Sequence, residues 1–244
     1  MIQINKTTQS GYKYLNLLIS LMVMLGVVTA IVQNRLVSYW GIDICAAVFV
    51  YPIPYVFYDI TTEVYGYKIA RQLIWCCIIA LLISVLLIVG VIHSPTPAFW
   101  SSYSEQFNVV MAPYSRTVIS GVIAIVAGQF INIYVISKFK ILTRGRFFWI
   151  RSVSSCLVGD TITTLLALTF IFFGRIEFYK IMQIIAYEVL ISIVIQAILA
   201  VPAISIVNFL KKSEGIDVYD YGVNFNPFKF SITESSSNIA KDNV

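Results

Sequence analysis

Charged side chains are scarce in this sequence. Aspartate, glutamate, lysine and arginine make up only 12% of the 244 residues, whereas soluble domains usually carry about 25%. Hydrophobic residues make up 59% of the chain, which is more than a soluble fold of this size can bury. The composition therefore excludes a soluble domain and indicates an all-α, polytopic membrane protein surrounded by the lipid bilayer.

Residues that metal sites and catalytic centres require are also rare. The chain has one histidine and four cysteines, and the cysteines lie in apolar runs without metal-ligand spacing. There is no Walker A loop, no Gly-x-Ser-x-Gly motif and no His-Glu-x-x-His motif. We therefore predict that the protein is not an enzyme and that it has no catalytic residues, no metal site and no cofactor.

Long apolar runs are abundant, and a membrane-spanning helix needs about 20 such residues. Five runs are long enough: residues 14–34, 72–92, 117–137, 152–174 and 181–207. A shorter run, residues 44–58, contains Pro52 and Pro54. Because proline removes a backbone donor and clashes one turn back, we expect this helix to be broken or to continue past Tyr58. The total predicted is six transmembrane helices.

Lysine and arginine are distributed unevenly between the connections. Thirteen of the 17 lie on one side of the membrane if the six helices alternate in direction. Since cytoplasmic loops are enriched in these residues, both termini are predicted to be cytoplasmic. We thus expect a transmembrane domain at 1–212, an external connection at 93–115 and a cytoplasmic tail at 213–244. The net charge of +5 follows from this sorting and does not indicate nucleic acid.

A few polar side chains interrupt the apolar runs. An ionisable group at membrane depth costs about 2.5–3.5 kcal/mol, so such groups usually face a bundle interior or a cavity. The candidates are Asp59, Glu63, Asp160, Glu188, Gln129, Asn132 and Gln196. Two alternatives to ligand binding stay open: ion pairs of the first two acids with Lys68 and Arg71, and helix packing by Asp160 with neighbouring threonines.

A short sequence echo links two of these acids. The letters DITT begin at Asp59, and DTITT begins at Asp160. In a division into three plus three helices these two positions correspond. Because three is an odd number, the two halves would be inverted, as in many transporters with a site at mid-membrane. The sequence therefore allows a 3+3 inverted repeat.

The stretch YPIPYVFYDITTEVYGYKIARQLIW, residues 51–75, resembles the signature of the queuosine precursor transporter family, also described as a vitamin uptake transporter family. Three further stretches agree with the family in the same order: residues 128–140, 147–155 and 216–230. The most specific part is the block Asp-x-x-x-Glu-Val-Tyr-Gly, which starts at Asp59. The resemblance covers nearly the whole chain.

The resemblance implies a six-span protein of the bacterial inner membrane that imports a 7-deazaguanine, a precursor of a modified transfer-RNA base. The candidates are the nitrile preQ0, the aminomethyl compound preQ1 and the free base queuine. Many members of the family carry aspartate where this chain has Asn132, and often another near Thr163. These two departures shift the expected binding role toward Asp160.

The chemistry of such a base suits the polar side chains of the helices. A carboxylate accepts the N1–H and exocyclic amine of a guanine edge in a charge-assisted pair. An amide can serve the O6 side, and an aromatic ring supplies a stacking face. The predicted substrate-binding residues are Asp59, Glu63, Tyr55, Gln129, Asn132, Asp160 and Glu188.

The sequence leaves two other functions open. One is a substrate-binding membrane subunit that needs a separate energising partner, and the other is uptake of a different vitamin-like heterocycle. The sequence does not determine the mode of energy coupling. It does not determine the oligomeric state either, and a homo-oligomer is one possible state.

Overall fold

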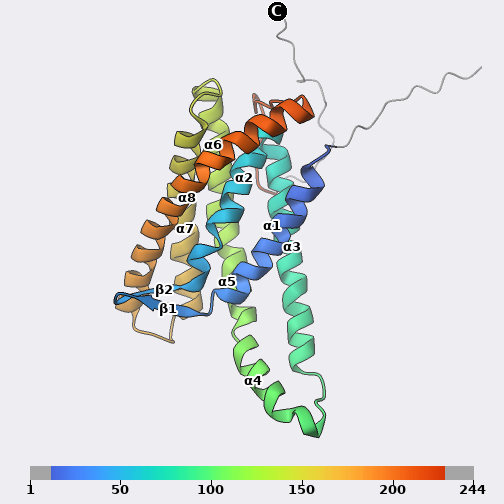
Figure 1. Ribbon diagram of the computed structural model, residues 1–244, viewed down its shortest axis with the longest axis vertical. Helices are drawn as coiled ribbons and strands as arrows, with labels where there is room; N and C mark the ends of the chain where they lie inside the picture. Colours follow the sequence, from blue (N-terminus) through green and yellow to red (C-terminus); the bar gives the residue numbers. More distant parts are fainter. Residues whose placement is uncertain (1–11, 229–244) are drawn as a thin grey trace, which may run out of the picture.

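The computed structural model describes residues 12–228 and is mostly helical (Figure 1). The helices are α1 Leu15–Val32, α2 Pro52–Tyr65, α3 Tyr67–Ile92, α4 Ser101–Met111, α5 Tyr114–Ala124, α6 Phe130–Leu142, α7 Phe148–Phe172 and α8 Phe178–Glu214. Short 3-10 turns occur at η1, Ala46–Phe49, and η2, Ala98–Trp100, and the π-helical segment η3, Ile125–Gln129, joins α5 to α6. The strands are β1 Leu36–Tyr39 and β2 Ile42–Cys45.

Five helical stretches within residues 12–228 are long and apolar enough to cross a membrane. They are α1, α3, the stretch Ala98–Leu142, α7 and α8. The predicted all-α polytopic class fits this structure. The small hairpin β1–β2 was not predicted, and it takes the first residues of the apolar run 44–58. The sixth predicted span corresponds to α2, whose 14 residues are fewer than the five long stretches contain.

The two prolines of the run 44–58 begin a helix and do not break one. Pro52 is the first residue of α2, and Pro54 follows in the same turn. Backbone donors in the first turn have no partner within the helix, so proline is tolerated there. The helix continues past Tyr58, as expected, and ends at Gly66, where φ is +84°. This positive φ is a conformation that glycine adopts without strain.

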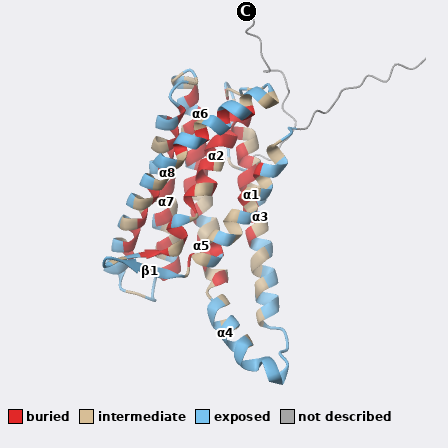
Figure 2. Ribbon diagram, in the orientation of Figure 1, coloured by how far each residue is buried: buried red, intermediate tan, exposed pale blue. Residues whose placement is uncertain are grey.

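Helix α2 is the central element of the bundle. Twelve of its 14 residues are buried, and it packs against α1, α3, α6, α7 and α8. Figure 2 shows buried residues along α2, whereas the outer surfaces of α3 and α8 are largely exposed. The exposed positions of α3 and α8 include Leu86, Leu87, Val194 and Ile198, as expected for surfaces that face lipid. The sequence of α2 thus carries two acids, Asp59 and Glu63, into the interior.

The two ends of the bundle differ in structure. At one end, which we call the tail end, residues 215–228 fold back over the ends of the helices. Val218 N donates to Val64 O at 3.4 Å, and Tyr67 Oη donates to Phe225 O at 2.8 Å. The opposite end, the hairpin end, carries β1–β2, and α3 and α4 project beyond it (Figure 1). The predicted connection 93–115 contains all of α4 and is therefore largely helical.

Helix α7 contacts the joined helices α5 and α6 backbone to backbone at two glycines. An ideal Cβ on Gly128 would lie 2.4 Å from the carbonyl oxygen of Gly159, and one on Gly159 would lie 2.6 Å from Asn132 Cβ. Small residues at helix contacts in membranes allow this close approach.

The predicted domain boundary at residue 212 lies in the last turn of α8, which ends at Glu214.

We expect Gly159→Ala to destabilise the bundle by about 1–3 kcal/mol, the usual cost of overpacking. The added methyl group would lie within 2.9 Å of Gly128 O as well as of Asn132 Cβ, so α7 and α6 would have to separate. Thermal unfolding of purified protein in detergent measures this loss. Gly90→Ala is the matched control, because a Cβ there has no heavy atom within 4 Å. Equal melting temperatures for the two variants would contradict the packing described here.

Candidate functional site

A cavity of about 130 Å³ lies inside the bundle between α1, α2, α3, α5, α7 and α8. Its polar lining residues are Thr29, Gln33, Tyr51, Tyr55, Tyr58, Cys77, Thr117, Gln129, Asp160, Thr163, Thr164 and Glu188. On α1 the lining runs from Gly26 to Gln33, the half of the helix that leads into the hairpin. The cavity therefore lies between the middle of the bundle and the hairpin end.

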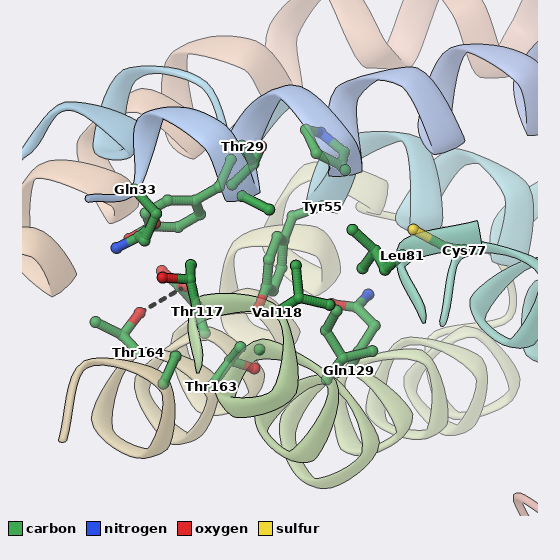
Figure 3. Close-up of a pocket in the computed structure, with 18 of the residues that line it drawn as sticks. Thr29, Gln33, Tyr55, Cys77, Leu81, Thr117, Val118, Gln129, Thr163 and Thr164 are labelled. Atoms are coloured by element: carbon green, nitrogen blue, oxygen red, sulfur yellow. Dashed lines mark hydrogen bonds between the residues drawn. The ribbon is translucent and has the colours of Figure 1, made fainter. Parts of the chain in front are cut away.

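The amide of Gln129 is the most unusual group of this cavity. Its side chain is 1% exposed, and neither its nitrogen nor its oxygen has a hydrogen-bond partner among the described residues. Figure 3 shows Gln129 and Tyr55 on opposite sides of Val118, with both side chains among those that surround the cavity. Gln129 is also the last residue of the π-helical segment η3, and such segments occur frequently at functional sites. A buried amide without partners is a group that a ligand can satisfy.

Three tyrosines, Tyr51, Tyr55 and Tyr58, form the aromatic part of the lining. Tyr51 and Tyr55 lie one helical turn apart at the start of α2, with ring centroids 6.0 Å apart. Both hydroxyl groups are buried and have no hydrogen-bond partner in the described part of the chain. The residues offer two ring faces and two unused hydroxyl groups to the cavity. Tyr55 was predicted as a site residue, but Tyr51 was not.

Asp160, on α7, is held by neutral donors from its own helix and from α8. Thr164 Oγ1 donates to Asp160 Oδ1 at 3.2 Å, and Gln196 Nε2 donates to Oδ2 at 3.2 Å. Ser192 Oγ also donates to Oδ2. Of the three threonines near Asp160 in sequence, only Thr164 bonds to it, since Thr161 and Thr163 donate to backbone carbonyls one turn back.

Glu188 reaches the cavity from the first half of α8. Its Oε1 accepts a hydrogen bond from the backbone N of Cys45 at 2.7 Å, which ties strand β2 to α8. Its side chain is 1% exposed. Glu188, Ser192 and Gln196 are spaced four residues apart, so they lie on one face of α8, the face that contacts Asp160.

Asp59 lies outside the cavity lining, in a contact between three helices. Asn132 Nδ2, from α6, donates to Asp59 Oδ1 at 2.8 Å. Ser152 Oγ and Cys156 Sγ, both from α7, donate to Oδ2, the latter at 3.3 Å. The structure thus brings the predicted residues Asp59 and Asn132 together, but it uses them to join α2 to α6 and α7.

Glu63 is the centre of an ion-pair cluster at the tail end. Arg151 Nη1 lies 2.7 Å from Glu63 Oε2, and Lys211 Nζ lies 2.7 Å from Oε1. Lys140 Nζ lies 3.7 Å from Oε1 and donates to the backbone O of Glu63 at 2.6 Å. Asp217 completes the cluster, which therefore consists of Glu63, Lys140, Arg151, Lys211 and Asp217.

These partners differ from the ones considered in the sequence. Lys68 and Arg71 are close to Glu63 along the chain, but the carboxylate pairs with cations of α6, α7 and α8. Arg71 donates from Nη1 to Asn226 O at 2.8 Å and so holds the tail. Lys140, Arg151 and Lys211 enter the sequence analysis only as a topology signal, because nothing in their spacing indicates that they share a carboxylate.

Asp217 connects the tail to this cluster. Its Oδ1 lies 2.6 Å from Lys140 Nζ and 2.8 Å from Lys211 Nζ. Partial burial alone would raise the pKa of Asp217, but the hydrogen bonds from these two lysines outweigh it and hold the pKa below the ordinary value of 3.8. The stabilisation from this carboxylate is thus complete above pH 3.8 and is lost as the pH falls through the lowered pKa.

Four of the seven predicted site residues line the cavity: Tyr55, Gln129, Asp160 and Glu188. The other three, Asp59, Glu63 and Asn132, take part in contacts between helices. Sequence reasoning missed Tyr51 and Gln33. Tyr51 could have been found from its spacing of four residues before Tyr55, which places both on one helix face.

The fold and the cavity define a polytopic membrane protein with a largely apolar cavity inside its helix bundle, at which a few buried polar side chains converge. The model of the putative vitamin uptake transporter family matches residues 45–207, which is more than half of the chain. The chain therefore belongs to this family, which is of the queuosine precursor transporter type. No curated protein and no solved structure matches the chain. Family and fold together make it a multi-pass membrane transporter for a small molecule.

Proposed function

We propose that the chain imports a queuosine precursor, a 7-deazaguanine such as preQ0, preQ1 or queuine, across the bacterial inner membrane. The substrate site in this proposal is the cavity around Gln129. The observation that carries it is the Gln129 amide, 1% exposed and without a partner in the described structure, in a cavity that Asp160 and three tyrosines also line. Membership of the family supports the choice of substrate.

The lining offers a partner for each part of a guanine-type base. The N1–H and the exocyclic amine are donors, and Asp160 or Glu188 would accept them. The carbonyl O6 is an acceptor, and the Gln129 amide N–H would donate to it, as amides do at base edges. Tyr51 or Tyr55 would stack on the ring, an interaction worth about 1–3 kcal/mol. In this arrangement the substrate supplies the Gln129 amide with a partner that it lacks among the described residues.

We also propose six membrane crossings, with α2 and η1 together forming the second. The 14 residues of α2 extend about 21 Å, and the four residues of η1 add about 8 Å. The sum approaches the membrane core of about 30 Å. The path supports this, because Ala46 N contacts Arg35 O at the hairpin end and Val64 O contacts the tail.

The proposed orientation places the tail end in the cytoplasm. The ion-pair cluster and the basic connection between α6 and α7 lie at this end, as expected for cytoplasmic segments, whereas Arg35 and Arg175 lie in connections at the hairpin end. Both termini would then be cytoplasmic, with residues 1–212 as the membrane domain and 213–244 as the tail. The 3+3 inverted repeat stays a prediction. The two acids that would correspond in such a repeat have different partners: Asp59 accepts hydrogen bonds from α6 and α7, whereas Asp160 accepts them from α8.

This orientation gives the two ends different roles in transport. The cavity occupies the half of the bundle that faces outside, and the ion-pair cluster with residues 215–228 closes the cytoplasmic side. Substrate would enter from the outside in this conformation. Release into the cytoplasm would require the ends of α2, α6, α7 and α8 to move apart, which breaks the pairs around Glu63.

Uptake of labelled bases tests the proposal. The host is a bacterium that lacks both the synthesis of the precursors and its own importer. Cells that produce the chain should accumulate at least one of preQ0, preQ1 and queuine, and the modified base should return to transfer RNA. Membrane-inserted chain without uptake of any of the three would contradict the proposed substrate. Uptake by the purified chain alone in proteoliposomes would exclude the need for an energising partner.

A further inference from the structure

The charged residues of the cavity lining are all acidic. Asp160 and Glu188 both line it, each with a side chain 1% exposed, and the lining contains no lysine, arginine or histidine. None of the ion pairs between described residues that involve Lys140, Arg151 or Lys211 includes Asp160 or Glu188. Among the described residues, the lining therefore supplies no cation to the two acids of the cavity.

The two acids are also close to each other. Ser192, which donates to Asp160, lies one turn beyond Glu188 on the same face of α8. One helical turn is about 5.4 Å. The Asp160 carboxyl group therefore lies next to α8 about one turn from Glu188. Adjacent carboxylates in a dry environment repel each other unless a cation or a proton compensates them.

The hydrogen bonds that Asp160 receives come from neutral groups. Three neutral donors, Thr164, Ser192 and Gln196, direct hydrogens at its two oxygens. Donors that converge on a carboxylate stabilise the anion. The structure thus supplies the hydrogen bonds of an anion without the positive charge that a buried anion requires, and it leaves that charge to the ligand.

Aromatic rings complete a site for a cation. Tyr51 and Tyr55 line the same cavity, and their rings lie 6.0 Å apart. A ligand ammonium group is attracted to the face of a tyrosine ring as well as to a carboxylate. The unpartnered amide of Gln129 remains available for the neutral edge of the same ligand.

We propose that the substrate carries a positive charge, and that Asp160 and Glu188 select an amine-bearing 7-deazaguanine over a neutral one. This inference rests on the proposed function and narrows it. One of the two carboxyl groups would accept the guanine edge of either base, and the other would pair with the protonated aminomethyl group of preQ1 or the protonated amine of queuine. The nitrile of preQ0 has the same ring system and no charge, so it is the matched neutral probe.

Competition between preQ1 and preQ0 for uptake tests the inference. The wild-type chain should prefer the amine by at least tenfold, because a hydrogen bond to a charged group contributes about 1.5–3 kcal/mol, which is about ten- to a hundredfold in affinity. This ratio should fall toward one in Asp160→Asn or in Glu188→Gln, whichever removes the carboxyl group that pairs with the amine. The ratio is measured within each variant, so a smaller amount of folded protein does not change it.

The outcomes separate the two proposals. Equal uptake of the two bases by the wild-type chain, or a preference for the nitrile, would overturn the charge-selection inference and leave the proposed function intact. An unchanged preference for the amine in both variants would also overturn it. Uptake of neither base, nor of queuine, would instead overturn the proposed function itself.

Discussion

Gln129→Met should stabilise the substrate-free protein and at the same time reduce uptake at least tenfold. Methionine fills a similar volume without polar atoms, so it removes an amide that is buried and has no partner in the described structure. Leaving such a group unsatisfied costs about 1–3 kcal/mol, and the melting temperature in detergent should rise accordingly. Uptake should fall because the substrate loses the donor for its carbonyl oxygen.

The opposite signs of the two effects make this prediction specific. A residue that serves only the fold would lower stability and uptake together when it is replaced. The control is Gln106→Met on the exposed surface of α4, which should change neither quantity by much. Wild-type uptake by Gln129→Met would mean that the amide does not contact the substrate.

Glu63→Gln should cause the largest loss of stability of any single substitution considered. It removes the carboxylate shared by Arg151, Lys140 and Lys211, the first two of which have side chains only 1% and 2% exposed. Breaking a buried pair by removing one partner typically costs about 3–5 kcal/mol, because the remaining charges stay buried. The amount of folded protein in the membrane and its melting temperature in detergent measure this loss.

Two further variants test whether the loss comes from the cluster. Glu105→Gln, on the exposed surface of α4, should leave the melting temperature unchanged. Adding Lys211→Gln to Glu63→Gln should restore part of the stability, because it removes one of the uncompensated cations. A Glu63→Gln protein as stable as the wild type would contradict the structural role of the cluster and its role in closing the cytoplasmic side.

The long helices could be predicted from the sequence because their signal is local. The apolar run 72–92 ends at the last residue of α3, Ile92, since twenty consecutive apolar residues have no other stable placement in a membrane. The hairpin β1–β2 has a weaker signal. Its two turn residues, Trp40 and Gly41, both have positive φ, as a tight hairpin requires, but tryptophan is an unusual residue for this conformation.

The candidate site could be predicted only in part, because only part of its signal is local in the sequence. Polar residues within apolar runs are visible in the sequence, and Gln129, Asp160 and Glu188 do line the cavity. Which acid is neutralised by cations is decided by contacts far apart in sequence. Glu63 pairs with Arg151 and Lys211. The cations that the sequence suggests as its partners, Lys68 and Arg71, are close to it only along the chain. Only the packing of α2 against α6, α7 and α8 determines these partners.

Filling the cavity is the most direct test of the claim that it binds the substrate. Gly121 lines the cavity, and a Cβ there has no heavy atom within 4 Å, so Gly121→Leu can place its side chain in this space without a clash at Cβ. Gly90→Leu is the matched control, because Gly90 also has open space but does not line the cavity. The measurement is uptake of labelled 7-deazaguanine per folded molecule. We predict that Gly121→Leu abolishes uptake while Gly90→Leu retains it, and wild-type uptake by Gly121→Leu would contradict the assignment of this cavity as the substrate site.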